Sequence, residues 1–134
     1  MVLDASALVE LLLHTPTGRA VALRIADPAV GLHVPHLADV EVAQAMRRYA
    51  NDGEINVAAA AVAIDDLRAL DLQRHAHEPL LDRVWTLRHN LSAYDAVYLA
   101  LAEILDVKLL TCDGRLARAP GAARHVELVK RLHR

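Results

Sequence analysis

Hydrophobic and polar positions follow two different periods along this chain. Short apolar runs typical of buried strands are separated by longer stretches in which apolar residues recur every three or four positions, as on one face of a helix. This pattern predicts strands at 2–4, 31–34, 70–73, 107–111 and 126–129, and helices at 6–13, 17–25, 36–51, 57–70, 78–89, 92–105 and 113–119. Because strands alternate with helices, we expect an α/β fold with a parallel sheet covered on both faces.

The residues between these elements are those that break helices and strands. Thr15-Pro16-Thr17-Gly18 interrupts the first helical stretch, Asp27-Pro28 forms a turn, and Asp52-Gly53 ends the long helix. The chain contains no internal repeat, linker or low-complexity segment. With 134 residues, it is long enough to bury one core. We therefore predict a single domain over residues 1–134.

The composition narrows the class of protein. Hydrophobic residues make up 54% of the chain, which excludes a disordered protein, while aromatics make up only 3% and Phe is absent. We therefore expect an aliphatic core and no aromatic platform on which nucleic-acid bases could stack. A single cysteine, Cys112, excludes an internal disulfide, and the longest apolar run, 57–64, is too short to span a bilayer. These features predict a cytoplasmic protein with no membrane partner.

Four acidic residues lie in largely apolar surroundings: Asp4, Glu41, Asp95 and Asp113. An ionised carboxylate is costly to bury unless something compensates its charge. Glu41, Asp95 and Asp113 have no basic residue three or four positions away, so a helical ion pair does not provide that compensation. A hard divalent cation would satisfy several carboxylates together. The net charge of −2 argues against a protein that coats nucleic acid, and it is compatible with a nuclease that binds cations.

Each acid also has a purely structural interpretation. Asp4 and Asp113 both precede a predicted helix, whose first N–H groups a carboxylate can accept. Asp95 is the only charged residue between positions 93 and 102, and Ser92 three residues earlier could cap the same helix. Periodicity alone does not decide whether Asp39 or Glu41 faces inward.

The topology gives an independent reason to group two of the acids. Asp4 and Asp113 each end a predicted strand, and parallel sheets bind ligands at the carboxyl ends of their strands. Ser6 and Thr111 could orient the carboxylates through their hydroxyl groups or serve only as a cap and a strand residue. We expect His75 and His77 to lie in a polar surface connector and Cys112 to be a small buried hydrophobe.

Four segments, in this order, resemble the PIN domain and especially the VapC-type toxin ribonucleases of bacterial toxin–antitoxin pairs. VLDASALVELLL resembles the opening strand and helix with the first metal-site aspartate, Asp4. EVAQAM resembles the E-x-x-N-x-L helix and selects Glu41 over Asp39, AYDAVYLALA carries Asp95, and LLTCDGRLA resembles the T-x-D segment with Thr111 and Asp113. The resemblance covers nearly the whole chain and implies a three-layer α/β/α domain whose central parallel sheet has four or five strands.

The resemblance implies an endoribonuclease that uses Mg²⁺ or Mn²⁺, held by Asp4, Glu41, Asp95 and Asp113. It also implies an RNA substrate, products with a 5′-phosphate and a 3′-hydroxyl, a homodimer, and a VapB-like antitoxin that lies in a groove between the N-terminal helices. Apolar residues of those helices, such as Leu8, Leu12 and Val21, could line such a groove or belong to the core. Gln44 stands where the family usually has Asn, which leaves its part in the site open.

Two other functions are compatible with these residues. A haloacid-dehalogenase-like phosphatase would use Asp4 as its nucleophile, but that chemistry requires a second Asp where this chain has Ser6. A non-catalytic scaffold would bind metal or an antitoxin through the same acids without turning over RNA. An assay of metal binding and RNA cleavage on one sample separates these possibilities.

Overall fold

The computed structural model describes residues 1–132. Within them, five strands form one sheet: β1 (Val2–Leu3), β2 (His33–Pro35), β3 (Gln73–His75), β4 (Leu109–Thr111) and β5 (Val126–Leu128). The sheet order is β3-β2-β1-β4-β5, and every neighbouring pair is parallel. The predicted α/β class with a parallel central sheet is confirmed.

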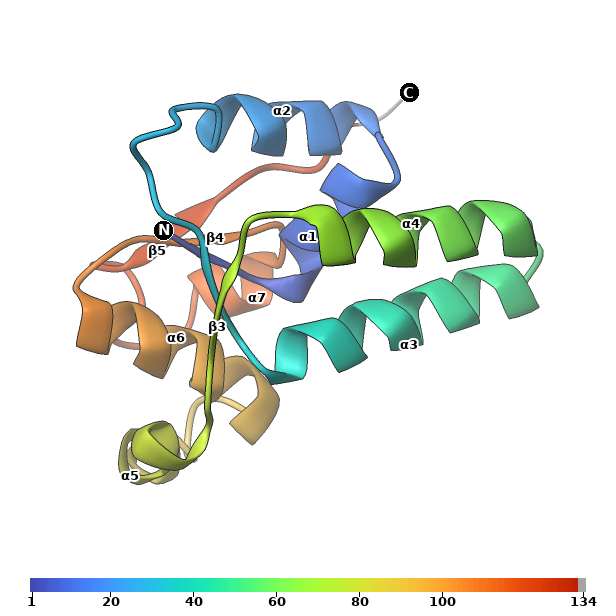
Figure 1. Cartoon of the computed structure of the whole chain (residues 1–134). Helices are drawn as coiled ribbons and strands as arrows, with labels where there is room; N and C mark the ends of the chain where they lie inside the picture. Colours follow the sequence, from blue (N-terminus) through green and yellow to red (C-terminus); the bar gives the residue numbers. More distant parts are fainter. Residues whose placement is uncertain (133–134) are drawn as a thin grey trace.

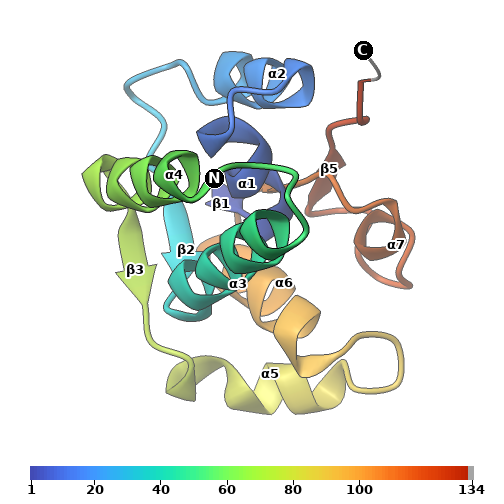
Figure 2. The same cartoon turned by 90° about the vertical axis from the view of Figure 1, so that its right-hand side faces the viewer.

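Helices cover both faces of this sheet (Figure 1). Their bounds are α1 (Ala5–Leu12), α2 (Pro16–Arg24), α3 (Leu37–Asn51), α4 (Val57–Ala69), α5 (Leu81–Thr86), α6 (Ala93–Leu105) and α7 (Gly114–Ala117), with a short 3₁₀ helix at Glu78–Leu80. Helices α1 and α2 lie on one side of the sheet, α5 and α6 lie on the other, and α3 and α4 form a hairpin that extends sideways (Figures 1 and 2). Within residues 1–132, every helix is too short or too polar to cross a lipid bilayer.

Most sequence-based boundaries agree with the structure, but the strand predicted at 70–73 is wrong. Leu70 instead ends α4, and the strand begins at Gln73, whose backbone N–H donates to Leu32 in the first ladder bond with β2. This is an edge strand whose first two side chains are exposed, so it lacks the apolar alternation that identifies inner strands. His75 consequently lies in a strand and not in a connector. The helix predicted at 78–89 is also shorter, because a 3₁₀ turn precedes α5.

The core forms around the central strand β1. Val2 and Leu3 are fully buried, and so are the inward faces of α1 and α2, including Leu8 and Val21, with Leu12 nearly so. Leu8, Leu12 and Val21 therefore belong to the core. Leu99 and Leu101 of α6 are also almost completely buried, which explains why that helix is apolar on nearly every face.

Helices α1 and α2 approach each other closely at Gly18. A Cβ atom placed there would lie 1.9 Å from the carbonyl oxygen of Glu10 and 3.0 Å from the backbone nitrogen of Leu11. Both neighbours are backbone atoms, so they cannot move aside as a flexible side chain would. Thr15 caps α2 by accepting the Gly18 N–H at 2.9 Å, which fixes the start of the helix at this contact.

We expect Gly18→Ala to lower the free energy of unfolding by about 3 kcal/mol, because the added methyl group must push the two helices apart. Urea denaturation followed by circular dichroism measures this change. Gly31→Ala is the matched control, since Gly31 is exposed and its Cβ would meet only the side chain of His33, at 3.3 Å. Equal stability of the two variants would contradict the proposed contact.

Candidate functional site

The carboxyl ends of the neighbouring strands β1 and β4 carry Asp4 and Asp113. We predict these two acids to lie together because parallel sheets bind ligands at the carboxyl ends of their strands. Asp4 directly follows β1 and caps α1, while Asp113 lies two residues beyond Thr111, the last residue of β4, and caps α7. Since β1 and β4 are paired in parallel, both acids emerge at the same edge of the sheet. Asp95 and Glu41 approach this edge from the beginning of α6 and from α3.

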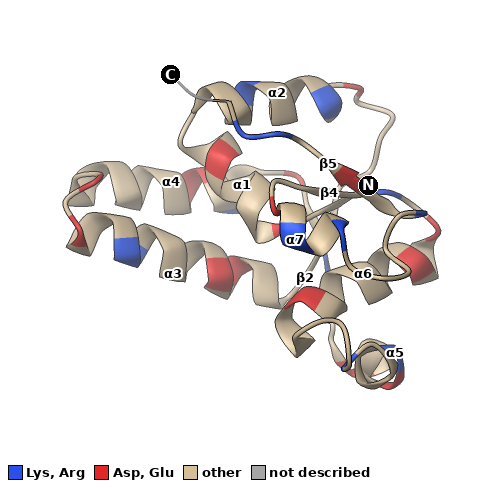
Figure 3. Cartoon of the chain, turned by 180° about the vertical axis from the view of Figure 1, so that it is seen from behind, with Lys and Arg blue, Asp and Glu red and all other residues tan. Residues whose placement is uncertain are grey.

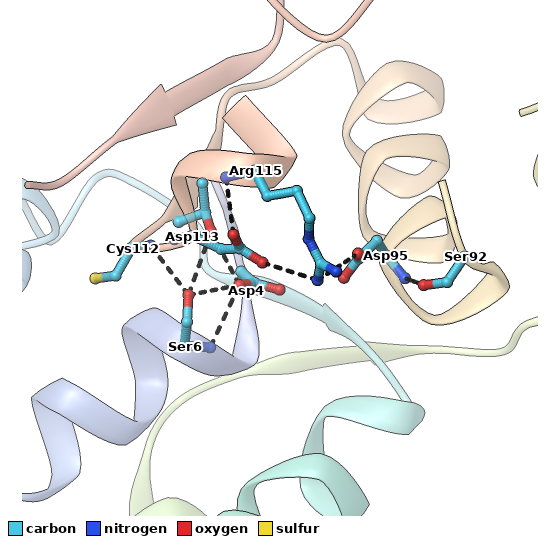
Figure 4. Close-up of polar contacts among 8 residues, drawn as sticks. Asp4, Ser6, Ser92, Asp95, Cys112, Asp113 and Arg115 are labelled. Carbon is cyan, nitrogen blue, oxygen red and sulfur yellow. Dashed lines mark hydrogen bonds and ion pairs between the residues drawn. The ribbon is translucent and has the colours of Figure 1, made fainter. Parts of the chain in front are cut away.

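Asp4 is held by hydroxyl groups (Figure 4). Its Oδ2 accepts hydrogen bonds from Ser6 Oγ at 2.5 Å and from Thr111 Oγ1 at 2.9 Å. Ser6 Oγ in turn accepts the Cys112 N–H at 3.0 Å, and Thr111 Oγ1 accepts the Asp113 N–H at 2.9 Å. Both hydroxyl groups therefore contact Asp4, but the prediction that Ser6 caps the first helix is wrong: α1 begins at Ala5, and Asp4 is its cap and accepts the Ser6 N–H.

The other oxygen of Asp4, Oδ1, accepts no hydrogen bond from residues 1–132. The Asp4 side chain is nevertheless only 6% exposed. Burial raises the pKa of this carboxyl above its usual range, the hydroxyl groups oppose that shift, and the charge of Asp113 adds to it. A buried carboxylate with one uncommitted oxygen and no basic partner is a suitable ligand for a cation.

Glu41 faces the interior and Asp39 does not. The hydroxyl group of Tyr98, which is 1% exposed, donates to Glu41 Oε1 at 2.6 Å. Asp39 instead forms a two-bond ion pair with Arg74 on the surface. Burial first, and then the charges of Asp4 and Asp95, raise the pKa of Glu41. Glu41 therefore lies close enough to Asp4 and Asp95 for their charges to affect its protonation.

Asp95 and Asp113 share one basic partner, Arg115 of α7. Arg115 Nη2 lies 3.4 Å from Asp95 Oδ2 and 3.4 Å from Asp113 Oδ2, and its side chain is 77% exposed (Figure 4). Burial and the charges of Asp4 and Asp113 raise the pKa of Asp95, while Arg115 opposes this. Figure 3 shows the acidic positions on α3 and at the start of α6 in the same region as the basic position on α7.

The sequence reasoning missed Arg115 and Tyr98. Arg115 lies two residues after Asp113 and 20 after Asp95, so neither ion pair falls at the helical spacings of three and four that the sequence analysis considers. Tyr98 did carry a signal, because a tyrosine in an apolar helix needs a partner for its buried hydroxyl group. The expected cap of α6 is present, with the Asp95 N–H donating to Ser92 Oγ at 3.2 Å.

The donor set suits a hard divalent cation, although it does not form a closed cage. Within the part of the chain that the structure describes, no three His, Cys, Asp or Glu side chains are arranged as a ready-made metal site. The negative charges of neighbouring acids raise the pKa of Asp4, Glu41 and Asp95, in addition to burial. Because each carboxylate supplies hard oxygen ligands and Asp4 has an uncommitted oxygen, the residues fit Mg²⁺ or Mn²⁺ better than a softer metal.

The structure also shows where Cys112, His75 and Gln44 lie relative to the acids. Cys112 is buried and free, and burial raises the pKa of its thiol to about 11, so it is not a nucleophile at neutral pH. The partner of the His75 side chain is another histidine and not one of the acids: its Nε2 lies 2.9 Å from Nδ1 of His33 on the neighbouring strand β2. Gln44 lies on the exposed face of α3, one turn beyond Glu41.

Comparison with known proteins gives consistent matches over the whole chain. The sequence model of the PIN domain matches residues 1–122. Ribonuclease VapC1 of Mycobacterium tuberculosis is 42% identical over 130 residues, which is 96% of this chain and 97% of that protein. Ribonuclease VapC9 of the same organism is 40% identical over 131 residues, 98% of this chain and 99% of that protein. The crystal structure of PAE2754 from Pyrobaculum aerophilum superposes with a TM-score of 0.67 at 27% identity, covering 90% of this chain and 80% of that chain.

We expect Glu41→Gln to stabilise the metal-free protein at pH 7. The folded state raises the pKa of Glu41, so the wild type loses stability as the pH rises through that raised value, and glutamine does not titrate. Below the ordinary glutamate pKa of about 4.3, the side chain is protonated in both the folded and the unfolded state, so the two proteins should no longer differ in stability for this reason. Thermal unfolding in EDTA over this pH range measures the effect.

The control for this comparison is Glu54→Gln, because Glu54 is exposed and is not one of the four acids of the proposed site. It should leave the melting temperature unchanged at every pH. A Glu41→Gln protein that melts below the wild type at pH 7 would show that the carboxylate stabilises the fold and would contradict the electrostatic analysis.

Proposed function

The chain belongs to the PIN-domain family and is a VapC-type ribonuclease, the toxin of a toxin–antitoxin system, and we propose that Asp4, Glu41, Asp95 and Asp113 form its active site. One observation carries this proposal: Asp4 is buried at the end of the central strand with no basic partner among residues 1–132, and its charge affects the pKa of Glu41 and Asp95, while the charge of Asp113 affects its own. The haloacid-dehalogenase alternative conflicts with the family and with Ser6 in the position where that chemistry needs Asp.

VapC-type ribonucleases use a divalent metal, and we propose that this protein uses Mg²⁺ or Mn²⁺. Held by Asp4, Glu41, Asp95 and Asp113, such a cation would supply a more acidic water molecule and would offset the charge that develops on the scissile phosphate. In this proposal Ser6 and Thr111 keep Asp4 in one orientation, and Tyr98 keeps Glu41 in one orientation. One of the four carboxylates accepts the proton of the attacking water.

Arg115 has a specific part in this proposal. Its guanidinium group contacts Asp95 and Asp113 and thus compensates two of the charges that a metal would compensate. Both ion pairs are long and Arg115 is largely exposed, so each is weak. We propose that Arg115 leaves the carboxylates when a cation binds and is then free to pair with a phosphate oxygen of the RNA.

The partners of this protein are those of its class: RNA as the substrate and a VapB antitoxin as the inhibitor. We propose in addition that the protein is a homodimer. Support comes from α5, where Leu81 and Trp85, one helical turn apart, are 54% and 68% exposed. These are large apolar side chains on one side of a short helix, and burial against a second copy would remove them from water.

We expect Asp4→Asn and Asp95→Asn each to reduce metal-dependent RNA cleavage at least about a hundredfold, because each removes a proposed cation ligand. Initial rates on defined RNAs with Mg²⁺ and with Mn²⁺ measure the loss. Asp39→Asn is the matched control, since Asp39 is an acid of the same helix as Glu41 whose partner is Arg74 on the surface. Full activity of either site variant would refute the proposed active site, and a wild type that binds Mn²⁺ without cleaving any RNA would favour the non-catalytic scaffold.

We expect Arg115→Gln to bind Mn²⁺ about two- to fivefold more tightly than the wild type, because the cation no longer displaces a guanidinium group from two exposed ion pairs. Isothermal titration calorimetry in the absence of RNA measures this affinity separately from activity. Arg118→Gln, at an exposed position three residues later, should leave it unchanged. Weaker Mn²⁺ binding by Arg115→Gln would contradict the competition between Arg115 and the cation.

A further inference from the structure

A groove leads away from the acidic site between α1 and α3. Its volume is about 480 Å³, within the range of cavities that hold a small organic molecule, and Ser6 and Glu41 line the end that adjoins the acids. We call it the α1–α3 groove. Its other lining residues include Val9 and Glu10 of α1, Gln44, Arg48 and Tyr49 of α3, Tyr94 of α6, and Arg131. A chain bound at the acids has this groove as a continuation of the same surface.

Tyr94 is the exposed aromatic residue at the mouth of this groove. It immediately precedes Asp95 and is 63% exposed, whereas Tyr98 one turn later is buried and bonded to Glu41. The side chain of Tyr94 forms no hydrogen bond with residues 1–132, and nothing in the core requires a large ring at this position. An exposed ring next to a catalytic carboxylate is well placed to stack on a base of a bound nucleic acid.

The opposite wall of the groove offers polar groups at a helical spacing. Glu41, Gln44 and Arg48 follow one another on the same face of α3, and Arg48 lies about 10 Å along the helix from Glu41 at 1.5 Å per residue. The Arg48 guanidinium lies over the ring of Tyr49, 5.4 Å from its centroid, and has no ion pair with the described residues. Stacking on Tyr49 orients Arg48 and leaves its N–H groups available for a phosphate.

On these observations, and resting on the proposed ribonuclease function, we propose that the α1–α3 groove binds the single-stranded RNA segment next to the scissile phosphate, with one base on Tyr94 and one phosphate on Arg48. Gln44 lines the same groove and can hydrogen-bond to a base edge. The low aromatic content of the chain excludes a broad stacking platform, and the groove presents one largely exposed ring, Tyr94, beside the half-buried ring of Tyr49 that Arg48 covers. A single ring tolerates any base, so the groove contributes affinity more than sequence selection.

RNA fits the groove better than a peptide for two reasons. The groove is continuous with the acids, where the substrate must lie, and Arg48 has no acidic partner of its own among residues 1–132. Arg131, by comparison, already pairs with Glu10 on the other side of the groove. A free guanidinium group at the far end suits a phosphate of the strand that passes through the site.

The test measures binding of short fluorescein-labelled single-stranded RNAs by anisotropy, with Ca²⁺ in place of Mg²⁺ to suppress cleavage. We expect Tyr94→Ala to weaken binding about 5- to 100-fold and Tyr94→Phe to restore most of that affinity, because the ring and not the hydroxyl group stacks. We expect Arg48→Gln to reduce the slope of log affinity against log salt by about 0.7, as for loss of one phosphate contact with a single strand.

Two control variants also remove a large exposed side chain or an arginine, but at positions outside the groove. Leu23→Ala removes a large exposed apolar side chain from α2, and Arg47→Gln removes the arginine adjacent to Arg48 on α3. Both should bind RNA as the wild type does. With Mg²⁺ present, Tyr94→Ala should raise KM by the factor found for binding and change kcat much less, which separates a binding role from the effect of an acid.

The outcomes distinguish this inference from the proposed function. A wild type that neither binds nor cleaves any of the RNAs would overturn both. A wild type that cleaves RNA, with Tyr94→Ala and Arg48→Gln matching it in affinity and salt slope, would overturn the inference alone. If those two variants keep their RNA affinity but escape neutralisation by the co-expressed cognate antitoxin in cells, the groove binds a peptide and the RNA assignment falls.

Discussion

The arrangement of the whole site depends on a carboxylate that is buried at the end of the central strand. Asp4 cannot move into solvent, because β1 is fully buried and pairs with β2 on one side and β4 on the other. Its charge is stabilised by the hydroxyl groups of Ser6 and Thr111, which come from α1 and β4. Neutral donors orient a carboxylate without cancelling its charge, so the site keeps its attraction for a cation. A lysine or arginine in the same place would neutralise the carboxylate and remove that attraction.

The same reasoning explains why the acids lie near one another without closing into a cage. Burial and mutual repulsion raise the pKa of Asp4, Glu41 and Asp95. At neutral pH, the ionised forms of these carboxylates therefore destabilise the folded chain. Arg115 relieves part of this repulsion from an exposed position where it is easily displaced. The site therefore combines groups that are held firmly, Asp4 and Glu41, with two that share a weak and exposed counter-charge. Such an arrangement lowers the stability of the folded chain, as is common where activity requires like charges to lie close together.

Much of the fold follows from the order of its patterns. Alternating strands and helices specify the parallel sheet, and the strand-end rule alone puts Asp4 and Asp113 at one edge of it. What the pattern does not contain is the pairing of residues far apart in the chain. Tyr98 and Glu41 are 57 positions apart, and Arg115 reaches Asp95 across 20. The edge strand β3 is hard to place for a related reason: its position depends on where β2 begins, and its own exposed side chains carry no periodic signal.

The central position of β1 also determines when the site can exist during synthesis. The first strand to be made pairs with β4, and the hydrogen bond from Thr111 to Asp4 spans 107 positions. Until residues 109–113 have left the ribosome, Asp4 lacks one of its two hydroxyl donors and Asp113 is missing from the site. Contacts this distant in sequence form late in folding. A nascent chain that has not yet reached residues 109–113 therefore lacks two of the groups that complete the proposed active site, Thr111 and Asp113.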